Sequence, residues 1–77
     1  MSGWPSISGK ELIKALVRAG YEPSHQKGSH VVLRRVLAPH RRLTVPEHRE
    51  MAKGTLSAIA RESGLGPERL KHLLAEA

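Results

Sequence analysis

One histidine in this chain stands where acid–base chemistry is possible. His30 follows the pair Gly28-Ser29 and opens a β-branched run that ends in two arginines. An imidazole can accept or donate a proton near neutral pH, and cations beside it can hold a phosphate group. This arrangement favours proton transfer on a phosphodiester. Position alone favours a plainer interpretation, a solvated histidine at a strand edge. The choice between the two interpretations therefore depends on the rest of the chain.

The charge of the chain indicates a polyanionic partner. Thirteen Lys and Arg residues oppose seven acids, all of them Glu, and the formal net charge is +6. The excess lies in the middle, where seven cations from Lys27 to Lys53 oppose two glutamates. A basic middle favours nucleic acid or an acidic protein as partner, against a merely solvated basic surface. With one Trp, one Tyr and no Phe, contacts to shape and backbone are favoured over base stacking.

Length and composition exclude several classes of protein. Seventy-seven residues predict a single domain, residues 1–77, without room for a separate cofactor domain. Cysteine is absent and the five histidines lack the close spacing of common zinc sites, so we expect no metal and no cofactor. No apolar run approaches the ~20 residues of a membrane span. The first residues lack the pattern of a secretory signal, so we expect a cytoplasmic protein without a membrane partner.

Apolar spacing predicts three helices. A capping-box pattern at Ser8–Glu11 predicts a first helix over 9–19. A second helix is expected over 54–64, with Thr55 as its possible cap. Proline at its first turn predicts a short last helix over 67–74.

Three β-rich runs lie between the first two helices and predict an antiparallel meander over 21–26, 29–37 and 41–45, with Pro23 marking an edge strand. Alternation assigns one face to the core, namely Val31, Leu33, Leu43 and Val45. The open face then holds His30, Arg34, Arg42 and Thr44. A bulge at Arg34-Arg35 would shift this register.

Short motifs in one order and spacing resemble the HicA toxin family. They are Ile7-Ser8-Gly9-Lys10-Glu11-Leu12, Gly20-Tyr21-Glu22, Lys27-Gly28-Ser29-His30, Val45-Pro46-Glu47-His48, Lys53-Gly54-Thr55-Leu56-Ser57-Ala58-Ile59 and Gly64-Leu65. The similarity extends from about Ile7 to Leu74. Residues 36–42 depart from the polar hairpin usual in that family.

The resemblance implies a fold and an activity. The α+β fold would look like a double-stranded RNA-binding domain, α-β-β-β-α with a short extra C-terminal helix, and with helices on one face of a three-stranded antiparallel sheet. The activity would be ribosome-independent cleavage of mRNA by the toxin of a type II toxin–antitoxin pair. The partner would be a HicB-type antitoxin protein. The catalytic histidine of the family's Gly-Ser-His motif corresponds to His30.

Cleavage of RNA without a metal needs a base for the 2′-hydroxyl, an acid for the leaving oxygen and cations for the phosphate. His30 can supply the base or the acid, and a second group or water supplies the other. The candidate RNA-binding residues are Lys27, Gly28, Ser29, Arg34 and Arg42. His48 and His25 are possible auxiliary groups, for which a structural role is the preferred interpretation.

Two non-catalytic alternatives remain open. Residues 58–70 resemble a helix-turn-helix with Gly64 in the turn, which would make the chain a DNA-binding module. The leucine-rich last helix and the position of the cations on the strands disfavour that interpretation. The other alternative is a module that binds double-stranded RNA without cleaving it.

Overall fold

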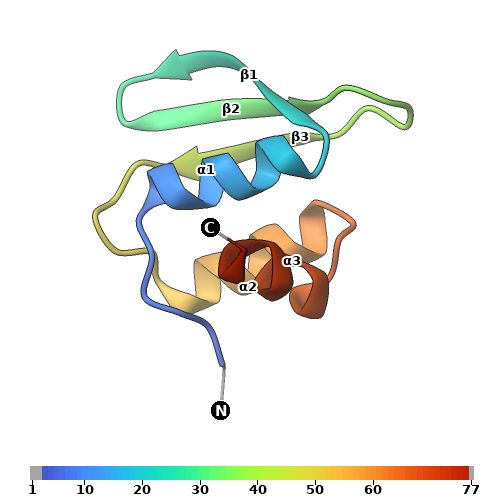
Figure 1. Ribbon diagram of the computed structural model, residues 1–77. Coiled ribbons are helices and arrows are strands. Elements are labelled where there is room, and N and C mark those ends of the chain that lie inside the picture. The colour runs from blue at the N-terminus through green and yellow to red at the C-terminus, as the bar shows by residue number, and fades with distance from the viewer. Residues whose placement is uncertain (1–2, 77) are drawn as a thin grey trace.

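The structure, a computed structural model, describes residues 3–76. The first two residues and the last one lie outside the described residues. The prediction that the N-terminus carries no secretory signal therefore falls partly outside them. The elements of the structure are α1 (Gly9–Arg18), β1 (Tyr21–Lys27), β2 (His30–Arg35), β3 (Arg42–Pro46), α2 (Lys53–Glu62) and α3 (Pro67–Ala75). The strands form one antiparallel sheet in the order β1-β2-β3. Figure 1 shows the three helices on one side of this sheet. The predicted α+β fold is therefore confirmed.

Helix α1 begins as its sequence predicts. The Ser8 hydroxyl accepts the Glu11 N–H at 3.2 Å, and the Glu11 carboxylate accepts the Ser8 N–H at 2.9 Å. This reciprocal pair satisfies two backbone donors that a helix start would otherwise leave unpaired. The helix ends at Arg18, one residue before the predicted end, and Gly20 leaves it with a φ of 101°.

Helix α2 begins differently from the prediction. It starts at Lys53 with Ala52 as N-cap and no side-chain cap, so the predicted cap at Thr55 is wrong. The start is instead held by tertiary structure, because Met51 is buried and its N–H donates to the Ile7 carbonyl at 2.8 Å. Pro67 opens α3 as predicted.

Strand β2 is shorter than predicted, ending at Arg35 instead of residue 37. The Arg35 N–H donates to the Arg41 carbonyl at 2.9 Å, and the Val36 N–H turns away to the Gly20 carbonyl at 2.9 Å. Residues 36–41 therefore form a loop, in which Leu37 is 71% exposed. The loop lies at the end of the sheet opposite the β1–β2 turn (Figure 1).

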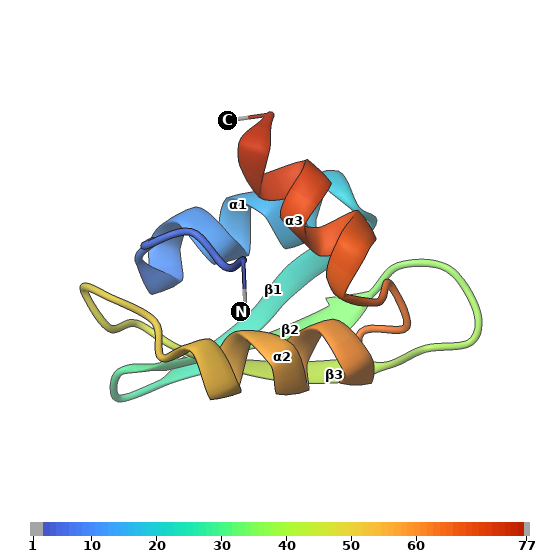
Figure 2. The ribbon, with the colours of Figure 1, turned by 90° about the horizontal axis from the view of Figure 1, so that it is seen from below.

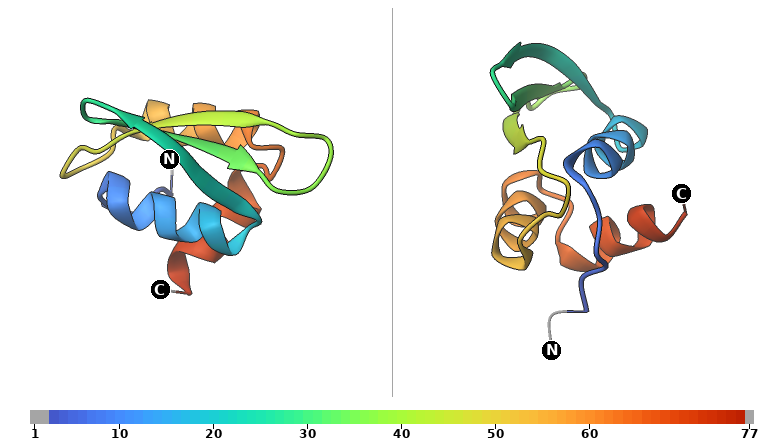
Figure 3. Two further views of the ribbon diagram at one scale, coloured as in Figure 1. Left: turned by 90° about the horizontal axis from the view of Figure 1, so that it is seen from above. Right: turned by 90° about the vertical axis from the view of Figure 1, so that its left-hand side faces the viewer.

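The core lies between the sheet and the helices. Its largest fully buried side chains are Leu12, Leu16, Leu33, Leu43, Val45, Leu56 and Leu70. Full burial of one such side chain contributes ~1.5–3 kcal/mol. Helices α1 and α2 pack on the inner face of the sheet, and α3 packs on these two helices (Figure 2), whereas from above the strands lie in front of the helices (Figure 3). The outer face is thus left uncovered by the described residues. None of the helices in residues 3–76 has the length and apolar character needed to cross a bilayer.

Candidate active site on the open face of the sheet

The uncovered face carries three rows of side chains across the strands. Directly paired residues of antiparallel strands point to the same side of a sheet. The rows are Lys27, His30 and Pro46; then His25, Val32 and Thr44; then Glu22, Arg34 and Arg42. The residues predicted for the core, Val31, Leu33, Leu43 and Val45, are all buried. The predicted faces of β2 and β3 are therefore confirmed.

A two-residue turn positions His30 at the start of β2. Gly28 has a φ of 60°, which a side chain would strain, and glycine at the first central position is typical of a type II′ hairpin. The turn is fastened to the end of β3, because the Ser29 carbonyl accepts the Glu47 N–H at 2.7 Å. The pairing of Lys27 with His30 closes the hairpin. A lysine and a histidine therefore share the first row.

The His30 side chain is exposed, and its ring makes no hydrogen bond within the described residues 3–76. Both ring nitrogens are thus available to solvent or to a ligand. An imidazole has one donor and one acceptor when neutral and two donors when protonated. The ring can therefore take or give a proton without first breaking a contact inside the protein.

The predicted cationic clamp divides into a near part and a far part. Lys27 lies opposite His30, whereas Arg34 and Arg42 pair with each other in the third row. Arg34 is four residues from His30 along β2, which is about 13 Å at ~3.3 Å per residue. Of these three cations, Lys27 alone is therefore placed to contact the same phosphate as His30. The arginines are placed for a phosphate farther along a bound strand.

The third row also contains an acid, Glu22. Glu22 forms an ion pair with Arg34 at 3.6 Å, and both side chains are about half exposed, at 52% and 54%. An exposed pair of this kind contributes only ~0–1 kcal/mol, so a phosphate can displace the carboxylate. Because this ion pair is weak, Arg34 remains able to bind a phosphate.

Two other arginines serve the fold. Arg41 donates to the Glu62 carbonyl at 3.1 Å, and Arg18 donates to the Leu73 carbonyl at 2.6 Å. Both cations thus bind carbonyls in the last turns of helices, where the helix dipole is negative. Arg41 belongs to the basic middle of the sequence, but its guanidinium is already engaged.

A bulge in β1 determines the position of His25. The register shifts between Pro23 and His25, and the β2–β3 register is regular, so no bulge occurs at Arg34-Arg35. Beyond the bulge, His25 pairs with Val32 and joins the open face. Sequence reasoning did not place His25 on this face.

His48 lies in the connection between β3 and α2. Its carbonyl accepts the Gly9 N–H at 2.9 Å, which joins this connection to the start of α1. Gly9 is required at this contact, since a Cβ there would collide with the Pro46 carbonyl oxygen. The backbone of His48 therefore has a structural role, and its side chain is exposed.

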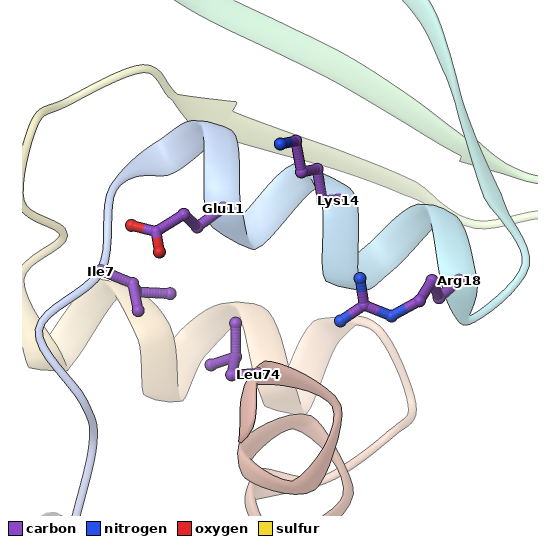
Figure 4. Close-up of a pocket in the computed structure, with 5 residues that line it drawn as sticks. All are labelled: Ile7, Glu11, Lys14, Arg18 and Leu74. Atoms are coloured by element: carbon purple, nitrogen blue, oxygen red, sulfur yellow. The ribbon is translucent and has the colours of Figure 1, made fainter. Parts of the chain in front are cut away.

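One pocket lies on the helix side of the sheet, between α1 and α3. Its volume is about 220 Å³, and its lining residues are Ile7, Glu11, Lys14, Arg18 and Leu74 (Figure 4). Glu11 is already used as the cap of α1, and Arg18 is bound to the Leu73 carbonyl. This pocket is on the side of the sheet away from His30, and we assign no chemistry to it. Among residues 3–76 no three His, Cys, Asp or Glu side chains are grouped to hold a metal ion.

The fold and this face define a small α+β domain with a basic, uncovered sheet. Comparison with protein families then shows which one: the model described as the HicA toxin of bacterial toxin–antitoxin systems matches residues 9–65. The chain therefore belongs to the HicA toxin family, whose members are generally ribonucleases and which implies an antitoxin partner. Neither the curated proteins nor the solved structures gave a significant match.

Proposed function

We propose that this protein is a ribosome-independent endoribonuclease that cleaves mRNA without a metal, with His30 as its general acid or base. One observation supports this most strongly. Within residues 3–76, an exposed histidine whose ring makes no hydrogen bond lies beside Lys27 on the sheet face that no helix covers. Proton transfer and phosphate binding are thus available at one place, which is what the reaction needs.

The reaction follows from the groups present. The 2′-hydroxyl is tethered next to the phosphorus and needs only a base to become the nucleophile. Its oxygen attacks phosphorus, the bond to the 5′-oxygen breaks, and that oxygen takes a proton from an acid. Lys27 stabilises the charge that develops on the phosphoryl oxygens, and the turn at Gly28 and Ser29 offers backbone and hydroxyl groups to the same phosphate.

Two cations of the open face, Arg34 and Arg42, lie farther along the strands from His30 and serve to bind RNA beyond the bond that is cut. Arg34 and Arg42 bind a phosphate away from the bond that is cut, because they lie two rows from His30. Arginine suits this role since its planar guanidinium binds phosphate in a bidentate way. Contacts to phosphates select for an RNA backbone more than for a base sequence.

The antitoxin in this proposal is a HicB-type protein. A face with exposed cations suits an acidic protein surface as well as RNA, because both present oxygen anions. An inhibitor that covers Lys27 and His30 would block RNA by occupying the same groups.

The helix-turn-helix alternative is disfavoured by the packing of α3. Leu70 is fully buried and Leu74 is 8% exposed, so the apolar side of this helix is part of the core. The helix has only nine residues, and Arg18 binds one of its carbonyls. Helix α3 lies on the helix side of the sheet (Figure 3), whereas Lys27, Arg34 and Arg42 are on the open face.

The test is cleavage of an RNA oligonucleotide by the purified protein, with a DNA oligonucleotide of the same sequence as control. We expect 2′,3′-cyclic phosphate or 3′-phosphate ends, the same rate in EDTA, and intact DNA. A 5′-phosphate end or loss of activity in EDTA would contradict the mechanism. Binding of duplex RNA without cleavage would favour the non-catalytic RNA-binding alternative.

A further inference from the structure

We propose that His25 is the second acid–base group of the site and works with His30 on the same phosphodiester. This inference rests on the proposed ribonuclease function. The reaction needs both a base and an acid, and the inference names the group that supplies the one His30 does not. Its basis is the bulge in β1, which brings a second exposed imidazole to the face that holds His30.

The bulge resolves a conflict between the two ends of β1. Tyr21 must face the core, because its side chain is only 2% exposed and its hydroxyl donates to the Ser63 carbonyl at 3.0 Å. Strict alternation from Tyr21 would place residues 25 and 27 on the core face as well. The turn requires Lys27 to pair with His30 on the open face. One extra residue, Ser24, satisfies both requirements and leaves His25 on the open face.

The two histidines are diagonal neighbours across β1 and β2. His25 pairs with Val32, which is two residues from His30 on the same face. Diagonal neighbours are ~7–8 Å apart at the backbone, within reach of two imidazole side chains with a phosphate between them. His25 is exposed, and its Nδ1 lies 3.4 Å from the Ser24 hydroxyl. That contact leaves Nε2 free to point toward a ligand.

The charged groups that face His25 come from all three strands, since the helices pack on the other side of the sheet. They are Glu22 and Lys27 on β1, His30 and Arg34 on β2, and Arg42 on β3. Glu22 is engaged by Arg34. The nearby carboxylate of Glu47 accepts a hydrogen bond from Gln26. Gln26 pairs across the strands with Val31, which faces the core.

Two histidines complete the proton balance of the reaction. One imidazole takes the proton from the 2′-hydroxyl as the bond from the 2′-oxygen to phosphorus forms. The other, protonated, gives its proton to the 5′-oxygen as the bond between phosphorus and that oxygen breaks. The products are a 2′,3′-cyclic phosphate and a 5′-hydroxyl, and exchange with water restores both imidazoles.

The experiment is the pH profile of RNA oligonucleotide cleavage by the whole protein and by three variants. They are His25→Gln, the double variant His25→Gln with Gln26→His, and His72→Gln. The double variant keeps the number of histidines but moves the imidazole to the other face of β1. His72 is an exposed histidine on α3, far from the sheet, and serves as the control. Circular dichroism establishes that each variant is folded.

For the unsubstituted protein and His72→Gln we expect a bell-shaped profile, with one limb from the base and the other from the acid. His25→Gln and the double variant should each lose one limb and ~10²-fold or more in rate. A folded His25→Gln variant with full activity and both limbs would refute the role of His25 and leave the proposed function standing. Recovery of activity in the double variant would refute it too, since the face would then not matter. Absence of RNA cleavage by the unsubstituted protein would instead refute the proposed function.

Discussion

Lys27 lies directly opposite His30 across the β1–β2 hairpin, whereas Arg34 and Arg42 lie two rows away. The cations of this face therefore have different jobs in the proposed reaction. Lys27 acts on the phosphate that reacts, and the arginines act on binding. Kinetic measurements can separate these roles, because a loss confined to the transition state lowers kcat and a loss of uniform binding raises KM.

We predict that Lys27→Ala lowers kcat by ~10²-fold, as expected for removing one group that stabilises the transition state. Arg42→Ala should instead raise KM several-fold with little change in kcat. Initial rates over a range of RNA oligonucleotide concentrations give both constants. The opposite pattern, with kcat lost in Arg42→Ala and kept in Lys27→Ala, would show that the reacting phosphate lies at the arginine end of the sheet.

We predict a moderate dependence of RNA affinity on salt. Each phosphate neutralised on single-stranded RNA adds ~0.7 to the slope of log affinity against log salt concentration. The face offers Lys27, Arg34 and Arg42, which gives a slope of about −2. Titrations at several salt concentrations measure it. A slope near zero would remove the electrostatic argument, and one near −5 would mean that cations outside this face bind RNA.

We predict that Gly9→Ala destabilises the protein by ~1–3 kcal/mol, as overpacking does. Its Cβ would collide with the Pro46 carbonyl oxygen and would lie 2.9 Å from the Glu47 Cα, and both obstacles are backbone. Gly54→Ala is the control, because no atom lies within 4 Å of its Cβ, and alanine in a helix should be neutral or stabilising. Midpoints of urea unfolding compare the two. Equal midpoints would show that the start of α1 does not lie against β3 as described.

We predict that Tyr21→Phe lowers stability by ~1 kcal/mol, because the Ser63 carbonyl loses its buried donor. Burial raises the pKa of the Tyr21 phenol, and the nearby cations Arg35 and Arg41 oppose that shift. The folded protein therefore holds this proton at a pH where the unfolded chain has lost it. The associated stability is fully present below about pH 10 and is lost as the pH rises through the pKa of the folded state. Unfolding of both proteins from pH 8 to 11 should show a steeper decline for the unsubstituted one; parallel curves would contradict it.

Local chemistry explains which parts of the structure were predictable. The capping box of Ser8 and Glu11 and the alternation of Val31 and Leu33 each act within a few residues, so the sequence shows them directly. The bulge at Ser24 is different. It arises because buried Tyr21 and the hairpin turn require the alternation of side chains along β1 to start from opposite faces. This conflict can be recognised only when the structure at both ends of the strand is known.

Tertiary contacts explain the remaining differences. The start of α2 is held by the hydrogen bond from Met51 to Ile7, 44 residues away in sequence, instead of by a cap at Thr55. The end of β2 is set by the hydrogen bond from Val36 to Gly20.

For the site, position and composition indicate His30 and its cations. Only the strand register shows that Lys27 lies opposite His30 and that Arg34 lies two rows away. The same register places His25, which the sequence predicted only near a strand edge, on the face of His30.

The central claim is that His30 transfers a proton in RNA cleavage, and the most direct measurement is the single-turnover rate of a folded His30→Ala variant on an RNA oligonucleotide. His72→Ala serves as the matched control, since it removes an exposed histidine far from the sheet. We predict that His30→Ala loses ~10²-fold or more in rate while its circular dichroism spectrum and unfolding midpoint stay unchanged, and that His72→Ala keeps its activity. A folded His30→Ala variant that cleaves RNA at the unsubstituted rate would contradict the assignment of this face as the active site.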